Sequence, residues 1–76
     1  MKTYGSEFKR LRRDAKLTQP ALAKMLGVCD QMISYVETGK KRPFDENRTL
    51  KLLTIFGKEE LLSSMMTLAS AYYGTL

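Results

Sequence analysis

Apolar side chains recur at helical spacing in the first part of the chain. Phe8, Leu11 and Ala15 lie three and four positions apart within a charged segment. This spacing predicts a short amphipathic helix over residues 6–16. Because Ser6 is a residue type that favours the N-cap position, the helix is expected to begin there.

Two brief helices separated by a glycine are expected next. Thr18 can cap the second helix and Gly27 can end it, which predicts a helix over residues 19–26. The apolar pattern then restarts and stops at Gly39, so a third short helix is expected there. Two short helices joined by a tight turn, over about residues 18–38, have the sequence form of a helix-turn-helix motif.

A fourth helix is expected to start near Asp45 or Glu46, because acidic residues suit a helix N-terminus. Gly57 would end it. Its expected apolar stripe consists of Leu50, Leu53 and Phe56.

The last segment, residues 58–73, contains two neighbouring apolar stripes. One stripe would serve the core, so the second motivates a dimer interface on this helix. The pattern alone does not decide which stripe has which role. The first stripe is Leu61, Met65, Leu68 and Tyr72; the second, which supplies the candidate interface residues, is Leu62, Met66, Ala69 and Tyr73.

No period-two strand pattern persists, so residues 1–76 are expected to form one all-α domain. The net charge of +5 is uneven. Residues 1–43 contain ten basic and four acidic side chains (+6), whereas residues 44–76 contain three and four (−1). This balance favours an acidic partner in contact with the N-terminal half. A membrane surface is not expected, because the last helix has almost no Lys or Arg beside its apolar face.

The composition argues against an enzyme. The chain has no His, a single Cys29 and no Gly-rich phosphate loop, so a zinc site, a His-based triad and an internal disulfide are not expected. We expect no metal, cofactor or small-molecule ligand.

No apolar stretch approaches the roughly 18 residues that span a bilayer, and no signal peptide is recognisable, which favours a cytoplasmic protein.

The third expected helix has one polar side. At 100° per residue, Cys29, Ile33 and Val36 share one face and the polar residues share the other. An amide on such a face can bind adenine bidentately, a hydroxyl can donate or accept, and a tyrosine can meet a thymine methyl group or a phosphate. The polar face consists of Gln31, Ser34, Tyr35 and Thr38.

Many positions in this region resemble a known family, the Cro/C1-type phage repressor domain. The resemblance runs from Phe8 to about Phe56 and implies a compact five-helix, lambda-repressor-like fold. It also implies that the third helix enters the major groove while the second crosses the DNA backbone. The matching positions are Leu17-Thr18-Gln19, Leu22-Ala23, Leu26-Gly27-Val28, Ile33-Ser34, Glu37-Thr38-Gly39 and Lys40-Lys41-Arg42-Pro43.

The resemblance assigns roles to individual residues. It implies an ion pair between Arg12 and Glu37 that ties the first helix to the third. Instead of contacting a base, Asp30 could complement the positive N-terminus of the third helix. Instead of binding phosphates, the basic residues 40–42 could form a solvated turn. The expected base-reading residues are Asp30, Gln31, Ser34 and Tyr35. The expected phosphate-binding residues are Gln19, Thr38, Lys40, Lys41 and Arg42.

One position departs from the family pattern. Cys29 stands where Ser or Thr commonly caps the third helix, so the cap could move to Asp30. Cys29 itself is expected to be small and half-buried.

Taken together, these patterns predict a homodimeric, sequence-specific repressor of a near-palindromic double-stranded DNA operator. The alternative is an antitoxin or anti-repressor that binds a protein partner through its last helix.

Overall fold

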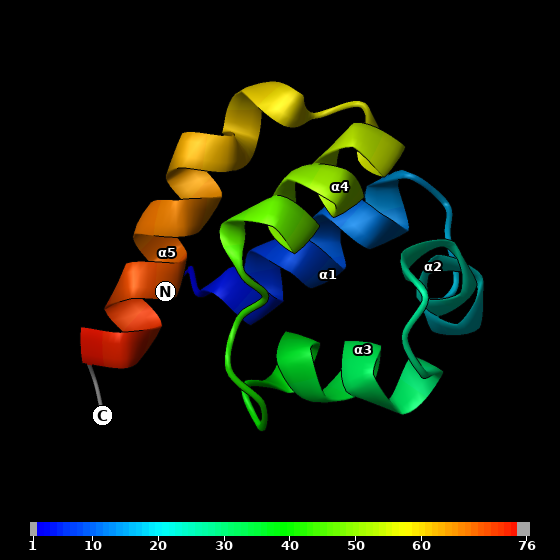
Figure 1. The fold of residues 1–76 in the computed structure, drawn as a ribbon, viewed down its shortest axis with the longest axis horizontal. Helices are drawn as coiled ribbons and strands as arrows, with labels where there is room; N and C mark the ends of the chain where they lie inside the picture. Colours follow the sequence, from blue (N-terminus) through cyan, green and yellow to red (C-terminus); the bar gives the residue numbers. More distant parts are fainter. Residues whose placement is uncertain (1, 75–76) are drawn as a thin grey trace.

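The computed structural model describes residues 2–74, which form helices, turns and loops without a strand (Figure 1). This confirms the expected all-α, five-helix class. The elements are α1 (Tyr4–Asp14), α2 (Gln19–Leu26), α3 (Asp30–Thr38), α4 (Glu46–Phe56), the 3-10 turn η1 (Glu59–Leu61) and α5 (Leu62–Gly74).

Helices α1 and α4 occupy the middle of the molecule, α5 runs along one side, α2 lies on the opposite side, and α3 runs along the lower edge (Figure 1). Helix α1 contacts both α3 and α5. Phe8 of α1 is completely buried, and its ring lies 6.0 Å from that of Phe44 and 6.3 Å from that of Phe56. The core therefore joins α1 to α4 and to the loop that precedes α4.

Helix α1 begins earlier than the sequence suggested. Thr3 is its N-cap: the Thr3 hydroxyl accepts from the Ser6 backbone N–H at 3.1 Å, and the Ser6 hydroxyl accepts from the Thr3 N–H at 2.9 Å. Ser6 is thus the third helical residue of a reciprocal capping box, not the cap. The helix also ends at Asp14, before Lys16 adopts a positive φ of 60°.

The expected start and end of α2 are confirmed, because Thr18 accepts from the Ala21 N–H and Gly27 ends the helix with a φ of 73°.

Helix α3 has Cys29 at its N-cap position without a side-chain hydrogen bond. The cap therefore does not move to Asp30. Cys29 is also exposed, so its placement on the buried face and its expected half-burial are both wrong.

The stripe expected for α4 is partly wrong. Leu50 is 41% exposed, whereas Thr49, Leu52 and Leu53 are completely buried. Thr49 can be buried because its hydroxyl is satisfied: it lies 2.8 Å from the Tyr4 hydroxyl and donates to the Phe44 carbonyl. Asp45 is the N-cap of α4.

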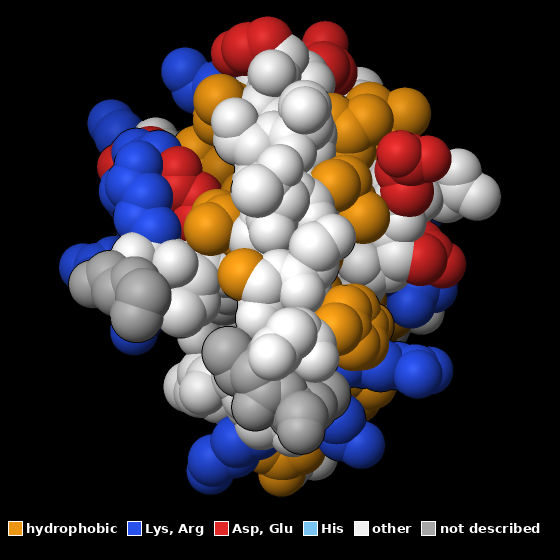
Figure 2. Space-filling model, turned by 90° about the vertical axis from the view of Figure 1, so that its left-hand side faces the viewer, with side chains coloured by type: hydrophobic (Ala, Val, Ile, Leu, Met, Phe, Trp, Pro, Cys, Tyr) orange, Lys and Arg blue, Asp and Glu red, His pale blue; other side chains and the backbone are white. Residues whose placement is uncertain are grey.

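Helix α5 faces the core between its two expected stripes. Met65 and Ala69, one from each stripe, are its buried residues. This corrects the assignment of Ala69 to a dimer interface, because its side chain packs inside the chain. Leu62 and Met66 are half-buried and Tyr73 is 50% exposed. In Figure 2 a band of backbone and small polar side chains runs down this side, with apolar side chains on both flanks.

The buried Tyr4 hydroxyl makes stability sensitive to alkaline pH. Burial raises the pKa of Tyr4 to about 12, although the hydrogen bond with Thr49 opposes the shift. Because the unfolded chain releases this proton near pH 10, the stabilising contribution is complete below pH 10 and disappears as the pH rises towards 12. A shift of this size corresponds to about 3 kcal/mol.

Urea unfolding at pH 9, 10 and 11 tests this effect against Tyr4→Phe. The wild-type unfolding free energy is expected to fall more steeply with pH than that of the variant, which has no proton to lose at this position. Equal slopes for both proteins would contradict the account.

Candidate nucleic-acid interface

Helices α2 and α3 pack against each other across a short turn. Leu22 and Leu26 of α2 and Ile33 and Val36 of α3 are buried, so the pair shares one apolar interior. The N–H of Val28 donates to the Ala23 carbonyl at 3.0 Å and closes the turn. Helix α3 lies at the lower edge of the molecule in Figure 1, with one side free of other elements.

The free side of α3 carries the polar residues expected there. Asp30, Gln31 and Thr38 are exposed, while Ser34 and Tyr35 are half-buried. The structure thus brings the four candidate base-reading residues together on one short helix. The Thr38 hydroxyl donates to the Ser34 carbonyl at 3.0 Å, so its hydrogen is already used within the helix.

The basic loop, Lys40 to Arg42, follows α3 directly, and its three side chains are exposed. The N–H groups of Lys40 and Lys41 donate to the Tyr35 carbonyl, which fastens the start of the loop to the helix. The Lys40 ammonium lies 5.8 Å from the centre of the Tyr35 ring. The loop therefore presents its cations from a defined position beside the last turn of α3.

The basic loop also has a neighbour that the sequence analysis missed. Arg48 in the first turn of α4 lines the same surface hollow as Lys41 and Arg42, with its guanidinium 5.4 Å from the centre of the Phe44 ring. Arg48 belongs to residues 44–76, whose net charge is negative, so comparing the net charge of the two halves of the chain could not identify it. In Figure 2 Lys and Arg side chains lie at the lower end of the molecule, whereas the upper end shows acidic side chains at the top and further Lys and Arg side chains at the upper left.

Gln19 does not have the free side chain that a phosphate contact was expected to use. Its amide nitrogen donates to Glu37 at 2.9 Å, and the residue is half-buried. What the first turn of α2 still offers a phosphate is its backbone N–H groups and the positive end of the helix dipole.

The ion pair implied by the resemblance is present. Arg12 donates to Glu37 through Nε at 2.6 Å and through a second nitrogen at 3.2 Å. The two side chains are only 9% and 1% exposed, and Arg12 also donates to the Leu17 carbonyl at 2.7 Å. This network fixes α1, the start of α2 and the last turn of α3 relative to one another.

The described residues contain no cluster of His, Cys, Asp or Glu that could hold a metal ion. No helix within residues 2–74 has the length and apolar character needed to cross a membrane.

The packed pair of short helices, the exposed polar face of the second and the cationic loop after it define a helix-turn-helix DNA-binding domain. A family model described as a helix-turn-helix domain matches residues 3–61, and the chain belongs to this family. The match is consistent with the resemblance to Cro/C1-type domains and indicates a DNA-binding regulator, a class that is typically not enzymatic. No curated protein and no solved structure matches the chain. Helix α5 begins just beyond the matched residues.

Proposed function

We propose that this protein is a transcriptional repressor that binds a near-palindromic DNA operator as a homodimer. The observation that carries the proposal is the polar face of α3 with the basic loop at its end. A helix of this size fits the major groove, and the loop can then meet the adjacent phosphates. Occupancy of a promoter would suffice to block transcription.

Base reading is assigned to the exposed side of α3. Gln31 would bind adenine through its amide, and Ser34 would donate to or accept from a base edge. Tyr35 would contact a thymine methyl group or a phosphate. Asp30 would accept from a cytosine amino group; its alternative role is to complement the positive N-terminus of α3.

Phosphate binding is assigned to the flanks of α3. Lys40, Lys41 and Arg42 supply charge on one side, and the first turn of α2, at Gln19, supplies backbone N–H groups on the other. Thr38 can join this set only if its hydroxyl leaves the Ser34 carbonyl.

Replacement of Gln31 and Lys41 separates these roles. Gln31→Ala is expected to weaken specific binding by about 1–3 kcal/mol and to relax the choice of one base. Lys41→Ala is expected to weaken all sequences similarly and to reduce the slope of log affinity against log salt by about one. Fluorescence anisotropy with an operator and a scrambled duplex, over a range of salt concentrations, measures both quantities. The assignment fails if the two variants lose specific and nonspecific binding alike.

Dimerisation is assigned to the exposed flank of α5. Leu62 and Met66 are half-buried and Tyr73 is half-exposed, so they retain apolar surface that a second copy could cover. Two-fold pairing would place two α3 helices about 34 Å apart, in successive major grooves. The alternative, an antitoxin or anti-repressor, would use the same flank for a different protein.

Met66→Lys is expected to raise the dimer dissociation constant by roughly tenfold to a hundredfold. It places a charge where the second copy would bury an apolar side chain, and such burial contributes about 1.5–3 kcal/mol. Sedimentation equilibrium measures the change. Leu50→Lys is the matched control, because Leu50 is a 41% exposed leucine on a different helix. A wild-type chain that is monomeric at micromolar concentration would favour the protein-binding alternative.

A further inference from the structure

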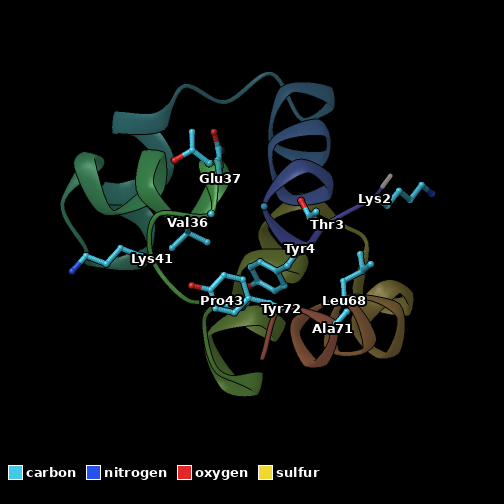
Figure 3. Close-up of a pocket in the computed structure, with 13 residues that line it drawn as sticks. Lys2, Thr3, Tyr4, Val36, Glu37, Lys41, Pro43, Leu68, Ala71 and Tyr72 are labelled. Atoms are coloured by element: carbon cyan, nitrogen blue, oxygen red, sulfur yellow. The ribbon is translucent and has the colours of Figure 1, made fainter. Parts of the chain in front are cut away.

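A cavity of about 250 Å³ lies where the DNA-binding elements meet the rest of the domain. Its walls come from the first turn of α1, the last turn of α3, the loop up to Pro43 and α5 (Figure 3). Water occupies about 30 Å³ per molecule in the liquid, and an apolar cavity of about 150 Å³ can bind benzene. The cavity therefore has room for one aromatic ring with a short polar substituent.

The walls of the cavity are largely apolar. Its apolar lining residues come from four parts of the chain: Tyr4 of α1, Val36 of α3, Pro43 of the loop, and Leu68, Ala71 and Tyr72 of α5. In Figure 3 Tyr4, Pro43 and Tyr72 lie in the centre of the view, with Val36 on one side and Leu68 and Ala71 on the other. Ligand sites usually combine such apolar walls with a few polar groups that fix the orientation of the ligand.

The charged side chains at the rim are positive. Lys2 and Lys41 line the cavity and are exposed, and in Figure 3 their side chains extend away from the other lining residues in opposite directions. Glu37 also lines it, but its carboxylate is only 1% exposed and is bound by Arg12. Lysine has a long, flexible stem, so the Lys41 ammonium group can turn towards a ligand at its end of the cavity. The charge complementarity selects an anion.

We propose that this cavity binds a small amphipathic carboxylate, with its apolar body between α3 and α5 and its carboxylate near Lys41. Binding links the ligand to DNA recognition, because Lys41 belongs to the basic loop and Val36 belongs to the last two turns of α3. A bound anion neutralises Lys41 and thereby lowers the affinity for DNA. This second effect rests on the proposed function, whereas ligand binding itself does not.

Titration of ¹⁵N-labelled protein with phenylacetate tests the binding site without DNA. Phenylacetamide and phenethylamine carry the same ring with a neutral and a cationic group. Saturable amide shifts at Val36, Gly39, Leu68 and Tyr72 are expected with phenylacetate, and binding of the other two compounds should be at least fivefold weaker. Shifts scattered over the surface, or equal binding of all three compounds, would overturn the proposal.

Two variants locate the site. Ala71→Phe places a ring in the cavity from an exposed position on α5 and is expected to abolish the saturable shifts. Lys41→Ala is expected to weaken phenylacetate severalfold, whereas Lys58→Ala, which changes an exposed lysine that does not line the cavity, should not. If Ala71→Phe binds phenylacetate like the wild type, the ligand lies elsewhere and the proposal is wrong.

The link to DNA is measured by titrating an operator duplex in the presence of saturating phenylacetate. The affinity for DNA should fall by about fivefold or more, with the salt slope lower by about one, and DNA should weaken phenylacetate by the same factor. Specific DNA binding that phenylacetate leaves unchanged would refute the link and leave the proposed function intact. Wild-type protein that does not bind DNA specifically would refute the proposed function, and the ligand titration would still stand.

Discussion

Glu37→Ala is expected to lower the free energy of unfolding by about 3–5 kcal/mol, because it leaves the buried Arg12 guanidinium without its carboxylate. Gln19 would also lose its acceptor. Small domains are stable by only about 5–15 kcal/mol in total, so this loss is a large fraction of the stability of the protein. Urea unfolding followed by circular dichroism measures the loss.

Arg10→Ala is the matched control for this prediction. Arg10 also makes two ion pairs, at 2.7 Å to Glu7 and 3.1 Å to Asp14, and its hydrogen bond lowers the pKa of Glu7. Its side chain is 52% exposed, so water replaces these contacts and little stability should be lost. The double variant Arg12→Met, Glu37→Leu removes both buried charges and should recover most of the stability. Equal losses for Glu37→Ala and Arg10→Ala would contradict the structural role of the buried pair.

Gly5→Ala is expected to destabilise the fold by about 2 kcal/mol, the upper end of a typical overpacking cost less the gain in helix propensity. A Cβ atom at this position would lie 2.5 Å from the Val36 carbonyl oxygen and also too close to that of Glu37. Both obstacles are backbone atoms at the end of α3, so α1 would have to move away from it. Overpacking of this kind costs about 1–3 kcal/mol or more, and it outweighs the gain of about 1 kcal/mol from the higher helix propensity of alanine.

Gly74→Ala separates the steric effect from the effect of helix propensity. Gly74 also belongs to a helix, but a Cβ atom there would meet no atom within 4 Å. This variant should be as stable as the wild type or slightly more stable. If thermal unfolding ranks Gly5→Ala equal to Gly74→Ala, the close contact between α1 and α3 is not formed in solution.

The local signals of helix ends predicted much of the fold. Thr18 caps the start of α2 and Gly27 ends it. Gly39 ends α3, where the left-handed φ of 81° suits glycine. Ser6 misled the prediction for α1 because Thr3, three residues earlier, is an equally suitable cap. Only the reciprocal hydrogen bonds between them show which residue is the cap.

The remaining differences depend on contacts between residues far apart in the chain. Thr49 is a polar residue that becomes buried because Tyr4, 45 positions away, meets its hydroxyl. The core side of α5 lies between two equally apolar stripes, and only the packing against its neighbours selects Met65 and Ala69. The sequence does not show that the Gln19 side chain has a hydrogen-bond partner, because that partner, Glu37, belongs to another helix.

The central claim, specific binding of DNA by a dimer, is tested most directly by selecting bound duplexes from a randomised pool and measuring the stoichiometry of the winning sequence. We expect a symmetric consensus with two half-sites about one helical turn apart, bound by two chains, with an affinity that falls steeply with salt. Weak binding that does not depend on sequence would contradict the account.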